Sequence, residues 1–496
     1  MSRPALASLR SELVTPLVAL ALAAILGTGL VWTTTHLEGK WLVAAIAGVM
    51  LMWLGLAFGQ FERFLLAVMI FSLPFNVDVR FDPTYTLSVM GIQPLRLSAI
   101  DLMLCLLYPA WIARILAERP SWRSLWPPGA TILAGLVAWS SLSLINAVEP
   151  FVSVLTLVDL VKGFLCYLYV ANHVTSRRDL KLVAWCLVAG LLIESLIACV
   201  QFVTRSTLGL DALGESRKLV AIEVGAERIS RVVGTLGHPN PLGRYLASVL
   251  PLVFLFNLPS APLRPSGRLM AIGSCVLAMF ALIFTLSRGA WVGLVVALVL
   301  LMGCLKALRR LRVRFWMVAV AVAVGITLGI FAPLIMARFV EPDRGAATSR
   351  LPQMHVAMSM ITAHPFVGVG LSNYILVMQR YDTTQEGITF RYMFHPVHNS
   401  FLLLGAEIGL VGLLGLLWFI WMVARRTWRR LRATEDALTV VVLLGLGAGL
   451  AAMVMHSLVE PRALLRDALF LIYSAILMSK GEWAAAPSGR RAEGAP

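Results

Sequence analysis

Charged side chains are scarce in this chain of 496 residues, and their scarcity excludes an ordinary soluble protein. Only 14% of the residues are charged, whereas 59% are hydrophobic. A soluble domain cannot bury that much apolar surface, and several of the apolar runs are long enough to cross a bilayer. The composition therefore predicts a helical protein that crosses a membrane many times.

Cysteine is also rare, and its placement excludes a disulfide framework. The chain has six cysteines, and no CxxC pair or Cys/His spacing typical of a metal site is present. The polar loops also lack a metal-type Asp-x-Asp pair, so we expect neither a metal nor a cofactor. All the cysteines fall in apolar segments, where we interpret them as small hydrophobic side chains: Cys105, Cys166, Cys186, Cys199, Cys275 and Cys304.

The formal net charge of +16 does not require a nucleic acid as partner. Nucleic-acid binding needs a basic soluble face or a motif, and the sequence has neither. Lys and Arg instead gather in alternate short connections between apolar runs, which the positive-inside rule places in the cytoplasm together with both termini. These connections contain Arg114/Arg119/Arg123, Arg177/Arg178/Lys181, Arg264/Arg268, Lys306 to Arg314 and Arg425 to Arg432.

The long polar connections then lie on the outer side, at 76–97, 205–238 and 336–397. The first apolar run is long enough to span a membrane and has no small-residue cleavage site, so we expect no cleavable signal peptide. Functional residues that face the outer side should therefore lie in these three connections or at the helix ends beside them.

His398 is the first candidate for chemistry. We expect a long helix to begin at about Val397, which puts His398 in its first turn. The free N–H groups of a helix start disfavour imidazolium, so this histidine should stay neutral, as a general base must. Asn399 beside it is expected to orient the ring or to bind a sugar hydroxyl. A histidine at the membrane interface that only caps local backbone is the alternative.

Two arginines are the next candidates. Arg288 joins two apolar helices with no polar loop around it, and a charge near the hydrocarbon needs a compensating partner. Arg350 follows Ser349, which is expected to cap a helix that runs to about Ala363. An anionic ligand would suit both positions, and solvated or topogenic arginines are the alternatives.

The 205–238 loop and the helix start after it add further cations that could form an electropositive funnel. Each of them alone could equally be a solvated surface charge. We select Arg217, Lys218, Arg231, His238 and Arg244 as candidate substrate-binding residues.

Three ionisable residues fall near the middle of apolar helices. Asp159 and Lys162 are three residues apart on one helix face and could neutralise each other, and Glu194 follows on the next helix. Ions at this depth are also found in secondary transporters, but the sequence has no inverted repeat to support that class. We interpret the three residues as a buried structural network.

The polar motifs occur together in an order that resembles the O-antigen ligase family. The resemblance covers roughly 230–415. The motifs are Arg231-Val-Val-Gly-Thr-Leu-Gly-His-Pro-Asn240, Ser287-Arg-Gly-Ala-Trp-Val-Gly293, Ser349-Arg350 with Ala363-His-Pro-Phe-Val-Gly-Val-Gly-Leu-Ser-Asn373, and His398-Asn-Ser-Phe-Leu-Leu-Leu-Gly-Ala-Glu-Ile-Gly-Leu-Val-Gly412.

The resemblance implies a glycosyltransferase that moves O-antigen from undecaprenyl diphosphate to the lipid A core without a metal. By position, Arg288, Arg350 and His398 match the essential arginines and histidine of the family, and Arg231 and His238 match less firmly. Arginines can neutralise the diphosphate leaving group, and a neutral histidine can take the proton of a sugar hydroxyl. We expect a single displacement that inverts the anomeric centre. O-antigen polymerases and protein O-oligosaccharyltransferases share the signature and remain alternatives.

The resemblance also implies the bacterial inner membrane, with the outer side as the periplasm. We predict an all-α polytopic membrane protein of about 12–14 transmembrane helices with a mainly helical periplasmic loop domain. The expected parts are transmembrane helices in 1–204, a periplasmic loop at 205–238, transmembrane helices in 239–335, a periplasmic loop domain at 336–397, transmembrane helices in 398–480 and a disordered cytoplasmic tail at 481–496.

Overall fold

The computed structural model describes residues 60–81, 95–224, 227–258, 261–308, 350–383 and 395–481, together with Ala332 and Met336. The apolar runs expected to span at 13–33, 41–58 and 315–335 lie outside these residues apart from Ala332, as does the tail after Gly481.

The chain forms two compact units, of which the smaller comprises Met1–Met69 and Met103–Pro120. Most of α3 (Phe61–Phe71) and α5 (Ala99–Glu118) belongs to it, and Arg114 forms an ion pair with Glu62. The larger unit comprises Ile70–Leu102 and Ser121–Pro496, and it carries every candidate site residue.

Helices account for most of the described chain. Seven helices are long and apolar enough to cross a bilayer, which confirms the all-α polytopic membrane class. They are α5, α8 (Pro150–His173), α9 (Arg177–Thr204), α11 (Pro265–Phe284), α12 (Arg288–Leu308), α18 (Ser400–Ala433) and α19 (Ala437–His456). The shorter helices are α6 (Trp122–Leu125), α7 (Ala130–Leu142), α10 (Pro239–Phe256), α15 (Arg350–Ala363), α16 (Tyr374–Val377) and α20 (Ala468–Met478), with 3₁₀ turns η1 (Ser143–Ile145), η2 (Asp211–Leu213), η3 (Gly234–Leu236), η4 (Met378–Tyr381) and η5 (Leu464–Arg466).

Helix α10 is the core of the larger unit, and almost all of its side chains are buried. It packs against α9, α11, α12 and α19. Glycine permits the close approach of α19, because a Cβ on Gly449 would lie 2.0 Å from the Ser248 oxygen. A Cβ on Gly293 would likewise lie 2.8 Å from the Ala452 oxygen, so α12 approaches α19 in the same way.

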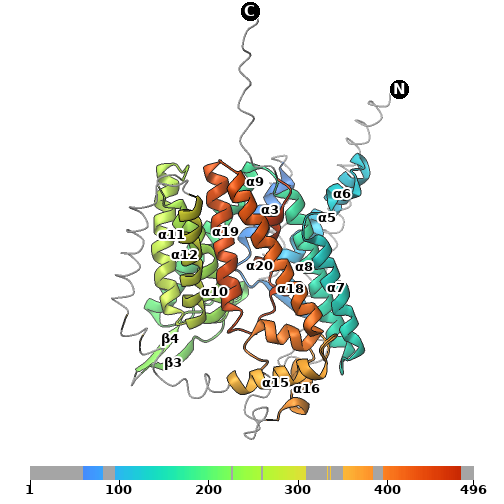
Figure 1. Ribbon diagram of the computed structural model, residues 1–496. Helices are drawn as coiled ribbons and strands as arrows, with labels where there is room; N and C mark the ends of the chain where they lie inside the picture. The colour runs from blue at the N-terminus through green and yellow to red at the C-terminus, as the bar shows by residue number, and fades with distance from the viewer. Residues whose placement is uncertain are drawn as a thin grey trace, which may run out of the picture. The chain divides into compact units, whose positions relative to one another are not determined.

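Helix α18 is broken at Gly409, whose backbone is non-helical with φ 76° and ψ 176°. The loop after α15 fills the break: Val369 N–H donates to the Ala406 oxygen at 2.8 Å, and Leu410 N–H donates to the Pro365 oxygen at 2.8 Å. Backbone groups that the break leaves unpaired are thereby satisfied. The His-Pro-Phe-Val-Gly-Val-Gly motif therefore supports the helix that follows His398, and the change of direction is visible in Figure 1.

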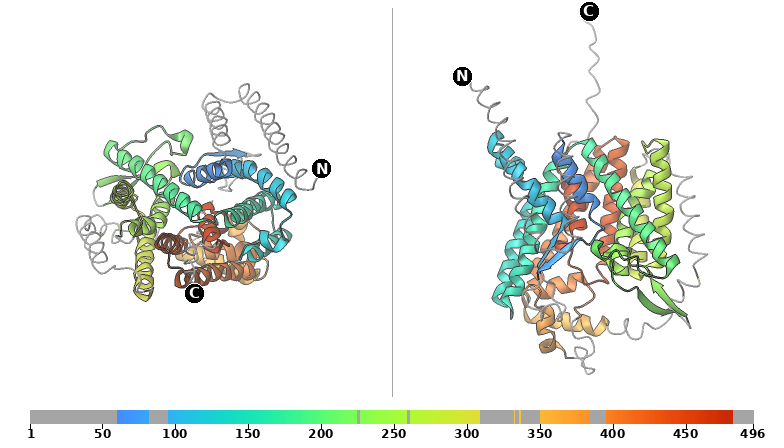
Figure 2. Two further views of the ribbon diagram at one scale, coloured as in Figure 1. Left: turned by 90° about the horizontal axis from the view of Figure 1, so that it is seen from above. Right: turned by 180° about the vertical axis from the view of Figure 1, so that it is seen from behind.

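Strands appear in two short antiparallel pairs, which were not expected. Strand β1 (Asp78–Phe81) pairs with β2 (Leu95–Ser98). Strand β3 (Val220–Val224) pairs with β4 (Glu227–Arg231), so part of the 205–238 loop is a hairpin. In Figures 1 and 2 this hairpin lies at the same end of the larger unit as α15 and α16, hereafter the site end.

The ionic residues inside the helices form an alternating chain of charges. Lys162 lies 3.0 Å from Asp159 and 3.1 Å from Asp101, which confirms that Asp159 and Lys162 neutralise each other. Arg466 adds a second cation 2.8 Å from Asp159. Glu194 is separate from this chain: it is fully buried and accepts hydrogen bonds from the Thr235 hydroxyl and N–H.

Candidate active site at the site end

His398 lies just before α18, not in its first turn as the sequence indicated. The helix begins at Ser400, and Asn399 is its N-cap. The Asn399 side-chain oxygen accepts from the N–H groups of Phe401 and Leu402, both at 3.0 Å. Asparagine is among the strongest N-cap residues, which moves the helix start past the histidine. This side-chain oxygen is therefore occupied by capping and does not orient the His398 ring.

The ring of His398 is oriented by Gln353 of α15, a buried residue that the sequence analysis missed. The Nδ1 atom of His398 lies 3.0 Å from Oε1 of Gln353. An amide oxygen only accepts hydrogen bonds, so Nδ1 carries the proton and Nε2 keeps a lone pair. Desolvation and the nearby charges of Arg350 and His395 lower the pKa of His398 to about 4. The neutral state is thus favoured by burial and cations.

Arg288 and Arg350 lie close to each other, although 62 residues separate them in the sequence. Each begins a helix, Arg288 in α12 and Arg350 in α15. The positive charge of Arg350 acts on both Arg288 and His398. The three residues chosen from the sequence as the chemical centre therefore gather at one place.

The turn between α11 and α12 that precedes Arg288 is tight. Leu286 connects α11 to α12 with a positive φ of 49°. A Cβ on Gly289 would lie 2.6 Å from Val459 Cγ2, so glycine lets the start of α12 approach the connection between α19 and α20. The Ser-Arg-Gly sequence thus places a cation beside that connection.

Arg231 reaches the site through a chain of hydrogen bonds. Its side chain is buried, donating from Nε to the Thr285 oxygen at 2.7 Å and from Nη2 to Asn240 Oδ1 at 2.9 Å. The Asn240 amide donates in turn to Oε2 of Glu460 at 3.0 Å. Arg231 therefore holds Asn240 in position, and its connection to Glu460 runs through Asn240.

Glu460 and Arg462 lie in the connection between α19 and α20 and were not selected from the sequence. Ser400 holds this connection: its hydroxyl lies 2.6 Å from the backbone oxygens of Glu460 and Arg462, and its N–H donates to Ser457. Burial raises the pKa of Glu460, while Asn240 and the charges of Arg462, Arg244 and Arg350 oppose the shift. Glu460 is thus a carboxylate among cations.

The remaining predicted residues have other places. His238 is the N-cap of α10, where its Nδ1 accepts from the Asn240 N–H at 3.2 Å. Arg244 is 4% exposed and pairs with the equally buried Asp467, so it lies beneath the site surface. Arg217 and Lys218 are exposed on the segment before β3, and no described contact brings them to His398.

The arrangement is suited to reactions of an anionic substrate. The charge of Arg350 acts on Arg288, on the neutral His398 and on the carboxyl of Glu460, and Arg462 adds a further cation at Glu460. No group of three or more His, Cys, Asp or Glu residues that could hold a metal occurs in the described part of the chain. The site therefore offers guanidinium groups for charge neutralisation and one base for proton transfer.

The fold and this cationic site define a polytopic helical membrane protein with polar chemistry at one end of its bundle. Residues 273–417 match the family model described as O-antigen ligase. This match contains Arg288, Arg350 and His398, and it supports the resemblance to the O-antigen ligase family that the motifs indicated. No curated protein matches the chain.

Proposed function

We propose that this protein is an O-antigen ligase, which transfers O-antigen polysaccharide from undecaprenyl diphosphate to a sugar hydroxyl of the lipid A core. The family in general uses a lipid-linked sugar donor and a lipid A-core acceptor. The observation that carries the proposal is the grouping of His398, Arg288 and Arg350 within the matched region. We also propose that the site end faces the periplasm and that both termini are cytoplasmic.

The arginines serve the leaving group in this mechanism. When the bond between the anomeric carbon and the diphosphate breaks, negative charge grows on the leaving oxygen. Arg288 and Arg350, each at a helix start, are placed to neutralise that charge through paired N–H donors. A membrane-anchored donor keeps its lipid tail in the bilayer, so its diphosphate meets the protein near helix ends of this kind.

His398 serves the acceptor. The hydroxyl of the acceptor sugar attacks the anomeric carbon and must lose its proton as the new bond forms. Nε2 of His398 is the lone-pair nitrogen, because Nδ1 donates to Gln353. The pKa of about 4 keeps the ring neutral at physiological pH and ready to accept the proton.

A single displacement with inversion fits the remaining groups. Retention would need an enzyme nucleophile at the anomeric carbon. The charges of Arg462, Arg244 and Arg350 act on Glu460, and its Oε2 accepts from the Asn240 amide at 3.0 Å. We therefore assign Glu460 to holding Asn240 and balancing the arginine charge.

The test uses purified protein with lipid-linked O-antigen and lipid A-core in vesicles. A ligase forms the polymer-bearing lipid A core and releases undecaprenyl diphosphate. An O-antigen polymerase would instead lengthen the lipid-linked polymer, and a protein O-oligosaccharyltransferase would need a protein acceptor. In a deletion strain, loss of the lipopolysaccharide ladder with polymer retained on the carrier supports the ligase, and an intact ladder contradicts it.

A further inference from the structure

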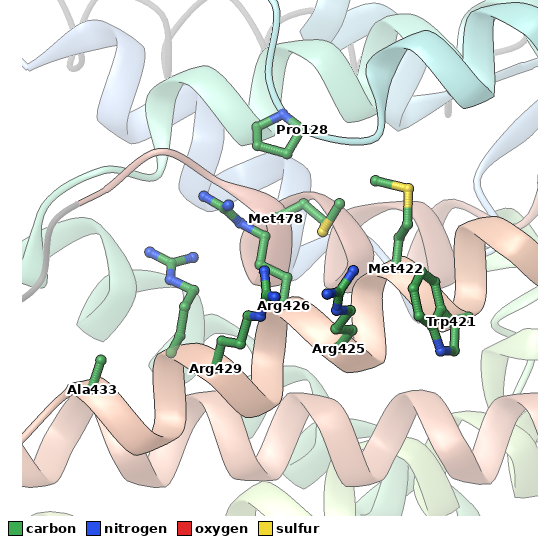
Figure 3. Close-up of a pocket in the computed structure, with 9 residues that line it drawn as sticks. Pro128, Trp421, Met422, Arg425, Arg426, Arg429, Ala433 and Met478 are labelled. Carbon is green, nitrogen blue, oxygen red and sulfur yellow. The ribbon is translucent and has the colours of Figure 1, made fainter.

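A pocket lies near Ala433, at the opposite end of α18 from His398. It encloses about 380 Å³. Its wall consists of the last turns of α18, the chain before α7 and the end of α20, and the labelled arginines extend from α18 toward Pro128 and Met478 (Figure 3). The lining residues are Pro128, Trp421, Met422, Arg425, Arg426, Arg429, Arg430, Ala433 and Met478.

Four of the nine lining residues are arginines, and none of these described residues is acidic. Arg425 and Arg429 are four apart on one helix, as are Arg426 and Arg430, and like charges at this spacing destabilise a helix. A helix that keeps two such pairs at one pocket needs a negative charge nearby. The pocket is therefore built for an anion.

Two of the arginines also form the wall of the pocket. Arg426 donates to the Ser479 oxygen at 3.1 Å, and Arg430 donates to the Leu477 oxygen at 3.2 Å. These bonds fix both side chains against the end of α20. The Nε atom of Arg426 is buried and has no hydrogen-bond partner among the described residues. Arg425 and Arg429 are exposed at the pocket mouth.

Tryptophans place the pocket at the boundary between lipid and water. Trp418 and Trp421 are 52% and 45% exposed, and exposed tryptophans near a helix end mark the level of lipid headgroups. The Arg425 guanidinium lies 5.0 Å from the centre of the Trp421 ring. Met422 and Met478 line the same pocket, so apolar surface adjoins the cations. A headgroup phosphate next to the start of its acyl chains matches this combination.

Topogenic charge alone does not explain the pocket. Arg177 lies at the same end of the bundle, because its guanidinium is 2.9 Å from Asp436 at the start of α19. A cation that only sets orientation can pair with an acid in this way or lie in solvent. The arginines of α18 instead converge on one cavity, and no acidic side chain is among the described residues that line it.

We propose that this pocket binds the phosphate headgroup of an anionic phospholipid from the leaflet at that end of the bundle. Basic pockets between transmembrane helices are known sites for such lipids. The lipid would neutralise the cluster and tie the end of α18 to α20 and to the chain before α7. The proposal does not depend on the glycosyl transfer proposed above.

The experiment measures lipid retention by native mass spectrometry of the full chain released from detergent. Wild-type protein is mixed with phosphatidylglycerol, with cardiolipin, or with phosphatidylethanolamine as the zwitterionic comparison. The test variant is Arg425→Gln/Arg429→Gln, which spares the two arginines that bond to α20. The control variant is Arg178→Gln/Arg264→Gln, which removes two exposed cations at the same end outside the pocket. Thermal unfolding in detergent establishes that both variants are folded.

We expect the wild type to retain anionic lipid over phosphatidylethanolamine and the test variant to bind it roughly 30-fold more weakly, or about 1 kcal/mol for each arginine. The control variant should match the wild type. Equal retention of all lipids, or equal losses in both variants, would mean that the cluster is topogenic only. Displacement of the lipid by millimolar inorganic phosphate would mean that the pocket recognises a free anion, and would also overturn the proposal.

Discussion

Gln353 accepts a hydrogen bond from Nδ1 of His398 at 3.0 Å, although the two residues lie in different elements and 45 positions apart. This bond selects one tautomer of the ring, and it makes α15 part of the proposed active site. A histidine presented only by its own loop would exchange tautomers freely. The relationship therefore connects the folding of the 350–363 helix with the chemistry at Nε2.

His398→Ala should lower transfer by a factor of about 10²–10⁴, the usual contribution of a general base. Expression and thermal stability should change little, because the residue precedes the helix and the cap is Asn399. The measurement is turnover of the lipid-linked donor with lipid A-core. His355→Ala, which alters an exposed histidine of α15, is the control. Near wild-type turnover of His398→Ala would remove it as the base.

The pH dependence should respond to Gln353. A base with a pKa of about 4 stays neutral above that value, so transfer should stay level from neutral pH down to about 5 and fall only as His398 becomes protonated. Gln353→Glu places an anion at Nδ1 and stabilises imidazolium, so the acid limb should move up by about 1–3 pH units. His355→Glu adds the same charge on the exposed face of α15 and should not move it. If the acid limb of the pH profile does not move in Gln353→Glu, protonation of His398 does not cause that limb.

Arg288→Ala and Arg350→Ala should each lower donor turnover by about 10²–10³, as expected when a group that stabilises a leaving anion is removed. Lysine should restore only part of the activity, because it keeps the charge and loses the paired donors. Single-turnover rates at saturating donor measure this effect. Arg217→Ala, at an exposed cation of the 205–238 loop, serves as control. Wild-type rates in both alanine variants would exclude the arginines from the site.

The product linkage should be inverted relative to the donor, and Glu460→Gln should keep turnover within about tenfold of wild type, since glutamine can still accept from Asn240. NMR of the donor and product linkages decides the configuration. Retained configuration, or a sugar trapped on Glu460, would demonstrate double displacement and reduce His398 to a supporting role.

Transfer should continue after the purified protein is stripped with excess EDTA, because the proposed charge neutralisation comes from guanidinium groups. The assay compares stripped protein with and without added magnesium or manganese. Loss of transfer that either ion restores would contradict the arginine mechanism.

The sequence predicted the class of the protein and a candidate centre for the site, but not the groups that hold that centre. Hydropathy and helix spacing are local properties, so the spanning helices and α15 could be located. Gln353 carries no local signal, because an amide on an apolar helix becomes functional only when His398 folds against it. The start of α18 was predicted too early, because a Pro-Val-His run can begin a helix as easily as precede one. Capping by Asn399 determines where the helix begins.

Glu460 has a weak local signal, because it is an acid in a short connection outside the three long polar connections. The family motifs end near Gly412, so they do not include it. Arg244 was assigned to substrate for a related reason: its position near a helix start is visible in the sequence, but its buried partner Asp467 lies 223 positions away.

The break at Gly409 divides α18 into two parts that meet different demands. The part after it, from Gly409 to Ala433, is about 36 Å long at 1.5 Å per residue and suffices to cross a bilayer. The part before it carries His398 at its start and is tied to the loop after α15. One residue inserted before Gly409 would turn His398 by about 100° about the helix axis. The same insertion after Gly409 would lengthen only the membrane-spanning part of α18. The length of that part could therefore change with bilayer thickness without changing the orientation of His398.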